Sequence, residues 1–187
     1  MFDACQFTMQ SERLEMGRST DVLARKDPGR EASGEQTAGQ DLNLSALRQT
    51  PGFMIRILQI QIFERFFEYF EALGLSPADY AILVTIRDNP TVTQSELAGV
   101  LKMQLPNLVK ILSKMEDEGT IKRRRSVRDK RAVELSLTPS GRKRTEDAVR
   151  LGNGFNAQTL AALNKHEQAA FLQMLMNLVE AHKSASR

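Results

Sequence analysis

The sequence predicts a mainly α-helical fold with one small β-hairpin, and three observations support this prediction. From about residue 44 onward, most large apolar residues recur at the spacing of a helix face. Residues 132–137 instead alternate strictly, with Val133, Leu135 and Leu137 on one face, which is the period of a half-buried strand. A short helix, a tight turn and a second amphipathic helix precede that strand, and this order is typical of a helix-turn-helix.

Residues 1–43 are predicted to form a disordered or flexible tail. Large apolar groups are sparse there, while Gly, Ser, Thr, Gln, Asp and Glu dominate. Such a segment cannot bury enough surface to offset the entropy lost on ordering. The tail contains Cys5, the only cysteine of the 187 residues. An intrachain disulfide and a cysteine-based zinc site are therefore excluded, and no metal or cofactor is predicted.

Two segments, 44–74 and 142–187, are predicted to form a helical dimerisation region. Thr50 and Pro51 suit the N-cap and first turn of a helix whose apolar residues occupy more than one face. The final helix, expected to begin near Asn164, is also more apolar than one core stripe requires. A partner subunit would cover this surface. The alternative is that the first helix is the central helix of a monomeric core.

The segment 75–141 is predicted to be a winged helix-turn-helix domain framed by the dimerisation helices. Ser76 and Pro77 start one helix, and the capping box Thr93–Glu96 starts a short one that reaches Leu101. The next helix is expected from about Leu105 to Gly119, with one apolar stripe toward the core. Its opposite face carries the polar set expected to meet DNA, together with Val109: Gln104, Pro106, Asn107, Lys110, Ser113 and Lys114.

A concentrated positive charge lies between Ile121 and Arg131, where seven cations stand against one acid, Asp129. The whole chain carries only +3. A basic hairpin tip suits a phosphate backbone, so the segment predicts double-stranded DNA as partner. Arg131 is expected to enter a minor groove, with Asp129 orienting its side chain. The contact residues expected on the hairpin are Arg123, Arg125, Arg128, Asp129, Lys130 and Arg131.

The helix that follows the hairpin is predicted to start at Thr138–Gly141 and to be long. Gly152 and Gly154 should weaken its middle by about 1 kcal/mol each relative to alanine, and a kink is possible there.

The run from Leu75 to Gly141 resembles the multiple-antibiotic-resistance regulator (MarR) family. The resemblance rests on Asp129-Lys130-Arg131 and on the stretch Leu137-Thr138-Pro139-Ser140-Gly141, and it covers roughly residues 44–182. It implies a cytoplasmic homodimer with interlocked terminal helices that represses transcription from a pseudo-palindromic operator. It also implies release by a small aromatic or anionic ligand. Lys102, at a turn position where the family usually has glycine, and the pair Pro106-Asn107 depart from the family pattern.

A ligand pocket is predicted from four residues: Arg56, Phe63, Phe67 and Tyr80. Arg56 would pair with an acidic group of the ligand. Two other readings of the chain stay open, a winged-helix module that binds protein and a redox-sensing regulator that uses Cys5. An enzyme is not predicted, because no nucleotide-binding glycine loop, serine elbow or metal-spaced cluster is present. No apolar run approaches the roughly 18 residues of a membrane span.

Overall fold

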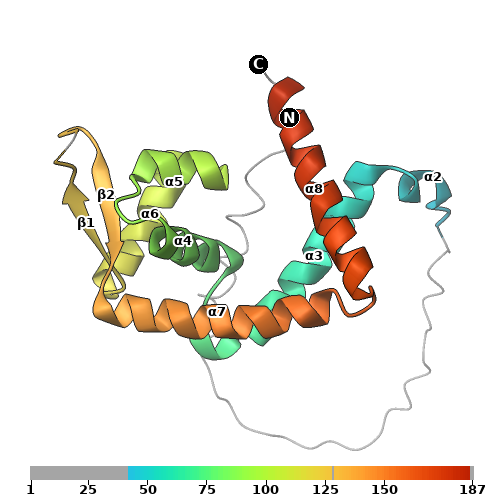
Figure 1. The fold of residues 1–187 in the computed structure, drawn as a ribbon, viewed down its shortest axis with the longest axis horizontal. Coiled ribbons are helices and arrows are strands. Elements are labelled where there is room, and N and C mark those ends of the chain that lie inside the picture. The colour runs from blue at the N-terminus through green and yellow to red at the C-terminus, as the bar shows by residue number, and fades with distance from the viewer. Residues whose placement is uncertain (1–41, 128, 186–187) are drawn as a thin grey trace, which may run out of the picture. The chain divides into compact units, whose positions relative to one another are not determined.

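The computed structural model describes residues 42–127 and 129–185, and it confirms the predicted class, a mainly helical chain with one antiparallel hairpin (Figure 1). The predicted tail, Cys5 included, lies outside these residues except for Leu42 and Asn43. The chain divides into two compact units, and the division falls inside one helix, between Gln61 and Ile62. The elements are α2 (Ser45–Arg48), α3 (Pro51–Tyr69), the 3-10 helix η1 (Glu71–Leu73), α4 (Pro77–Asp88), α5 (Gln94–Leu101), α6 (Leu105–Asp117), β1 (Ile121–Arg125), β2 (Val133–Leu137), α7 (Pro139–Thr159) and α8 (Lys165–Ala185).

Side-chain caps fix where the central helices begin. At α5 the amide of Glu96 donates to the Thr93 hydroxyl at 3.2 Å, and the Thr93 amide donates to the Glu96 carboxylate at 2.8 Å. This is the predicted capping box, which satisfies donors that the first helical turn leaves without partners. Ser76 and Asp79 form a second box at α4. The helix-turn-helix, α5 and α6, therefore has a start set by local sequence.

The first long helix ends earlier than its apolar pattern predicts. Apolar residues continue at helical spacing as far as Leu73, but α3 ends at Tyr69 and the chain continues as the 3-10 helix η1. Gly74 then takes a left-handed conformation, with φ of +56°. Glycine has no steric penalty there, so it ends the helical stretch and lets the chain turn into α4.

The core of residues 62–187 lies between α4, α5, α6, α7 and the hairpin. Phe66 and Phe70 stack with ring centroids 3.9 Å apart, and Phe155 of α7 meets Phe66 edge-on at 5.4 Å. The predicted apolar stripe of α6 faces this core, with Leu108, Leu112 and Met115 buried. Burial of a large apolar side chain is worth about 1.5–3 kcal/mol, so this stripe fixes which face of α6 points outward.

The glycines of α7 have a packing role and do not interrupt the helix, which runs unbroken from Pro139 to Thr159. A β-carbon at Gly152 would lie 2.6 Å from the hydroxyl oxygen of Tyr80, and one at Gly154 would lie 2.6 Å from that of Tyr69. Both distances are far shorter than van der Waals contact. The two glycines thus let the tyrosines of α3 and α4 approach the α7 backbone.

Two helices keep large apolar side chains exposed. On α3, in the unit that ends at Gln61, these are Met54, Ile55, Leu58 and Ile60. On α8 they are Leu172, Met174, Met176, Leu178 and Val179, each about half exposed, at 48–58%. Large apolar side chains that are exposed along two helices indicate surfaces for contact with another chain.

Candidate nucleic-acid interface

The outward face of α6 carries the residues that the sequence placed there. Gln104, Pro106, Lys110 and Lys114 are exposed, while Asn107, Val109 and Ser113 are half-buried. Gln104 is the N-cap of α6, but its side chain makes no capping hydrogen bond. Its amide is therefore not used within the cap. Because α6 is the second helix of the helix-turn-helix, we call it the recognition helix from here on.

The turn that leads into the recognition helix depends on Lys102. This residue ends α5 in the left-handed region, with φ of +54° and ψ of 34°. A residue with a side chain is uncommon in that conformation, which favours glycine. Position 102 thus differs from the family pattern in residue type, but Lys102 still adopts the left-handed conformation that the turn needs. Lys102 is exposed, so its charge stands beside the start of α6.

The hairpin, or wing, consists of β1 and β2 paired from Ile121–Leu137 to Arg125–Val133. Strand β2 is also held from its other side, because the Leu135 amide donates to the Val92 carbonyl at 2.9 Å. Leu135 and Leu137 are buried, as the alternation predicts. These contacts attach the base of the wing to the segment that precedes α5.

Two of the wing arginines pair with carboxylates. The Arg123 guanidinium donates to Glu116 of the recognition helix at 2.7 Å, and the Arg123 amide donates to the same carboxylate at 3.2 Å. The hydrogen bond from Arg123 lowers the pKa of Glu116 from its ordinary value. Arg123, predicted as a DNA contact, therefore has its charge largely offset within the protein.

Arg124 pairs with Glu134, and this pair shows a feature that the alternation of β2 does not predict. Glu134 lies on the face expected to be solvated, yet only 8% of the residue is exposed. The Ser126 hydroxyl donates to Glu134 at 2.6 Å and the Arg124 guanidinium donates at 3.3 Å. Hydrogen bonds to the charged carboxylate offset its loss of hydration, so the position tolerates burial.

The tip of the wing presents Lys130 and Arg131 to solvent, and Arg128 lies outside the described residues. Asp129 accepts a hydrogen bond from the Arg131 amide at 2.9 Å. We expected Asp129 to hold the Arg131 side chain, but the contact is to its main chain. The carboxylate shapes the turn, as aspartate commonly does two residues before an amide, and Arg131 stays exposed.

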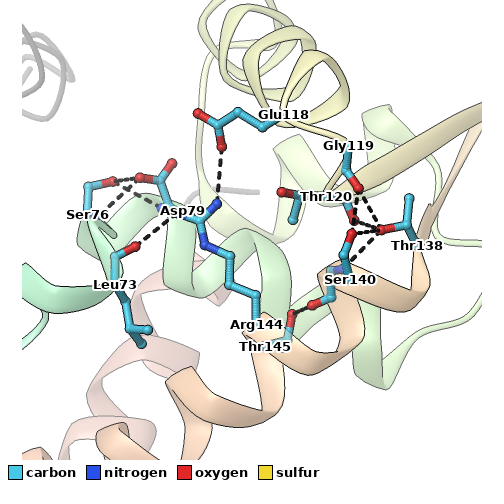
Figure 2. A network of polar contacts seen from close by, with 11 residues as sticks. Leu73, Ser76, Asp79, Glu118, Gly119, Thr120, Thr138, Ser140, Arg144 and Thr145 are labelled. Carbon is cyan, nitrogen blue, oxygen red and sulfur yellow. Dashed lines mark hydrogen bonds and ion pairs between the residues drawn. The ribbon is translucent and has the colours of Figure 1, made fainter.

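The end of the recognition helix is fastened to the start of α7 (Figure 2). The Thr138 hydroxyl donates to the Gly119 carbonyl at 2.7 Å, and the Ser140 hydroxyl donates to the same carbonyl at 3.0 Å. Gly141 lies so close that a β-carbon there would be only 1.9 Å from the Thr120 carbonyl oxygen. This contact gives a physical reason for the glycine in the stretch Leu137–Gly141.

The uncompensated charge of the interface comes from both elements. Within the described part of the chain, six exposed cations on α6 and the wing form no ion pair with a carboxylate: Lys110, Lys114, Lys122, Arg125, Lys130 and Arg131. Lys122 was not among the predicted contacts. The sequence could have indicated Lys122, because neighbouring side chains of a strand point to opposite faces. Ile121 is buried, so Lys122 on the other face points outward.

Of the four residues predicted to bind a ligand, Phe63, Phe67 and Tyr80 belong to the unit that begins at Ile62. Tyr80 meets Phe66 and Phe70, at centroid distances of 5.9 and 5.5 Å, and Phe67 meets Phe66 at 6.4 Å. Phe63 is half-buried one turn earlier on α3. Arg56 is exposed and belongs to the preceding unit.

Among the residues that the structure describes, no cluster of His, Cys, Asp or Glu could hold a metal ion. The helices among them are all too short or too polar to cross a membrane.

A capped helix-turn-helix followed by a basic hairpin defines a winged-helix transcriptional regulator. The model of the MarR family matches residues 75–133. A putative transcriptional regulatory protein for the hcr operon of Thauera aromatica is 32% identical over 132 residues, which are 68% of this chain and 77% of that protein. The chain belongs to the MarR family. Relatives of this kind are named as regulators of transcription, which agrees with the prediction that the chain is not an enzyme.

Solved structures share the fold with similar coverage. The transcriptional repressor CouR bound to a 23-mer DNA duplex is 28% identical, with a TM-score of 0.70 over 75% of this chain and 99% of that one. CouR bound to p-coumaroyl-CoA gives a TM-score of 0.67 at 27% identity, over 74% and 98% of the two chains. A mutant of MarR from Escherichia coli complexed with operator DNA gives 0.65 at 25% identity, over 74% and 99%.

Proposed function

We propose that the protein is a homodimeric repressor that binds a pseudo-palindromic operator in double-stranded DNA and releases it when a small ligand binds. The observation that carries this proposal is the position of the uncompensated cations. They occupy the outward face of the recognition helix and the wing that follows it, while the opposite face of α6 is buried. CouR and the MarR mutant, both solved on DNA, support the assignment. Binding to chromosomal DNA would place the protein in the cytoplasm.

The dimer is proposed from the apolar surface of the terminal helices. Residues 44–74 and 142–187 would form the dimerisation region, and residues 75–141 would form the DNA-binding domain. The exposed apolar side chains of α3 and of α8 need a cover, and a second copy supplies two such helices at once. A two-fold dimer presents two recognition helices, and these match the two half-sites of a palindrome.

Each predicted contact residue except Arg123, whose charge Glu116 offsets, has a role that its chemistry allows. On α6, the amides of Gln104 and Asn107 suit adenine, and Lys110 suits guanine or a phosphate. Pro106, Ser113 and Lys114 would lie along the groove. On the wing, Arg131 would enter the minor groove, whose narrow form attracts guanidinium. Arg125, Arg128 and Lys130 would contact phosphates, and Asp129 would hold the turn.

Two substitutions test this assignment by gel shift on the DNA upstream of the protein's own gene. Lys110→Ala should weaken operator binding by about 1–3 kcal/mol if the contact is bidentate, with an altered base preference. Arg131→Ala should weaken it without changing the preference at the major groove. Lys165→Ala removes the same charge from the exposed start of α8 and should leave binding unchanged. Equal operator affinity in the wild type and in both interface variants would contradict the assignment of these contacts. The mass of the complex tests the dimer, and it should show two chains per operator.

Release by ligand is proposed for a small aromatic or anionic molecule held near Phe63, Phe67 and Tyr80, and Arg56 is the residue that the sequence offers for its acidic group. The aromatic contacts of Phe67 and Tyr80, together with the p-coumaroyl-CoA bound by CouR, support this choice. Addition of p-coumaroyl-CoA or of aromatic acids to the operator complex should release the DNA. For a compound that releases DNA from the wild type, Tyr80→Ala should weaken this release. If no compound of this class shifts the complex, ligand control by these residues is wrong, and the DNA-binding assignment is unaffected.

A further inference from the structure

Arg144 joins two parts of the chain that lie far apart in the sequence (Figure 2). It stands in the first turns of α7, and one nitrogen of its guanidinium donates to the Glu118 carboxylate at 3.1 Å. The other terminal nitrogen donates to the main-chain carbonyl of Leu73 at 2.9 Å. Glu118 is the C-cap of the recognition helix, and Leu73 is the last residue of η1. One side chain thus touches the end of the recognition helix and the turn that follows α3.

Both of these contacts are made to parts of the chain that are otherwise well fixed. Beyond Leu73, the Ser76–Asp79 capping box fixes the start of α4. Beyond Glu118, the hydroxyls of Thr138 and Ser140 hold the Gly119 carbonyl. A guanidinium is planar and carries its donors in a rigid fork, so two acceptors bound by it keep a fixed separation. A movement of the η1 turn would therefore be passed to the end of the recognition helix.

The ion pair alone does not account for this arrangement. The Arg144 and Glu118 side chains are 33% and 39% exposed, and water screens pairs of that kind strongly. The hydrogen bond to Leu73 is made to a main-chain carbonyl, so it depends on the direction of the donor as well as on its charge. The geometry of the fork is thus the property of Arg144 that no other cation would supply.

We propose that Arg144 is a positioning residue that couples the end of α3 to the recognition helix, and so sets the orientation in which the dimer presents its two recognition helices to DNA. This proposal rests on the proposed function, because it assumes a dimer that binds paired half-sites. It assigns to Arg144 no contact with DNA. Its effect would appear in the discrimination between operator and other DNA.

The first test compares affinities for the operator and for a random duplex of equal length at the same salt concentration. Arg144→Ala should lower operator affinity by about 5- to 150-fold, the usual range of coupling between sites, and leave the affinity for random DNA within about twofold. Arg144→Lys keeps the charge and the pair with Glu118 but lacks the fork, so it should behave like the alanine variant. The control, Arg142→Ala, removes the same charge from an exposed position in the same turn and should match the wild type.

The second test needs no DNA. A spin label at an exposed site on the last turn of the recognition helix, introduced by Asp117→Cys in a Cys5→Ser background, reports the distance between the two copies in the dimer. The distribution should be narrow with Arg144 present, and broader or displaced with Arg144→Ala and Arg144→Lys. Restored affinity and a narrow distribution in the lysine variant would show a role of charge only and overturn the proposal. If the labelled protein that keeps Arg144 shows no measurable distance between two copies, the dimer is rejected, and with it the proposed function.

Discussion

Affinity for the operator is expected to fall by about 10³–10⁵ between 50 and 200 mM salt if the dimer neutralises on the order of 6–10 phosphates. The described part of each chain offers six uncompensated cations on α6 and the wing, so a dimer has enough of them to reach this number. Cations released from the DNA on binding drive the dependence, which is linear in the logarithms of affinity and salt concentration. A titration by fluorescence anisotropy measures the slope directly.

The slope also separates the roles of single side chains. Lys130→Ala should reduce it by about 1 per site, because one phosphate-directed charge is lost. Arg123→Ala should change it less, since Glu116 already offsets the Arg123 charge in the free protein. A flat titration for the wild type would indicate a module that binds protein and not DNA, which is the alternative that the sequence left open.

Gly141→Ala is expected to cause the largest loss of stability among single substitutions near the interface. The new methyl group would lie 1.9 Å from the main-chain carbonyl oxygen of Thr120, which no side-chain rotation can relieve. Overpacking costs about 1–3 kcal/mol and occasionally more, and a contact with backbone belongs at the upper end. In a chain of this size each kcal/mol lowers Tm by about 2–4 °C. Thermal unfolding followed by circular dichroism measures the change.

Gly99→Ala provides the matched control. Gly99 also lies within a helix, but a β-carbon there would meet no atom within 4 Å. Alanine is favoured over glycine inside helices by about 0.8–1.0 kcal/mol, so this variant should melt slightly higher than the wild type. Because Thr138 and Gly141 hold the end of the recognition helix, Gly141→Ala should also weaken operator binding. A Gly141→Ala protein that melts like the wild type would refute the close packing.

Much of the fold follows from patterns that are local in the sequence. The Thr93–Glu96 capping box located the start of α5, and the alternation of Val133, Leu135 and Leu137 located β2. Such signals are reliable because a cap or a strand period involves residues only a few positions apart. The outward face of α6 followed from its apolar stripe in the same way.

The pairing of charges could not be predicted to the same extent. Arg123 and Arg125 are equivalent in the sequence, yet Arg123 meets Glu116 while Arg125 is exposed without a carboxylate partner in the described part of the chain. Both side chains lie on the same face of β1, so the difference depends on which position along the strand lies beside Glu116 of the recognition helix. Glu134 is similar, since its burial requires Ser126 across the hairpin. The early end of α3 reflects the turn at Gly74, which competes with an apolar pattern that would continue the helix.

The attachment of β2 on both sides leaves β1 as the outer strand of the small sheet. The main-chain groups of an outer strand invite pairing with a strand of another molecule, which leads to aggregation, and on β1 the Arg123 amide is already bonded to Glu116. Strand β1 has the sequence Ile-Lys-Arg-Arg-Arg, so two such edges that approached each other would bring like charges together. The lysine and arginine side chains proposed here to attract nucleic acid would thus also keep neighbouring copies from associating edge to edge. Replacing them with neutral side chains would therefore remove a protection against self-association along with affinity for DNA.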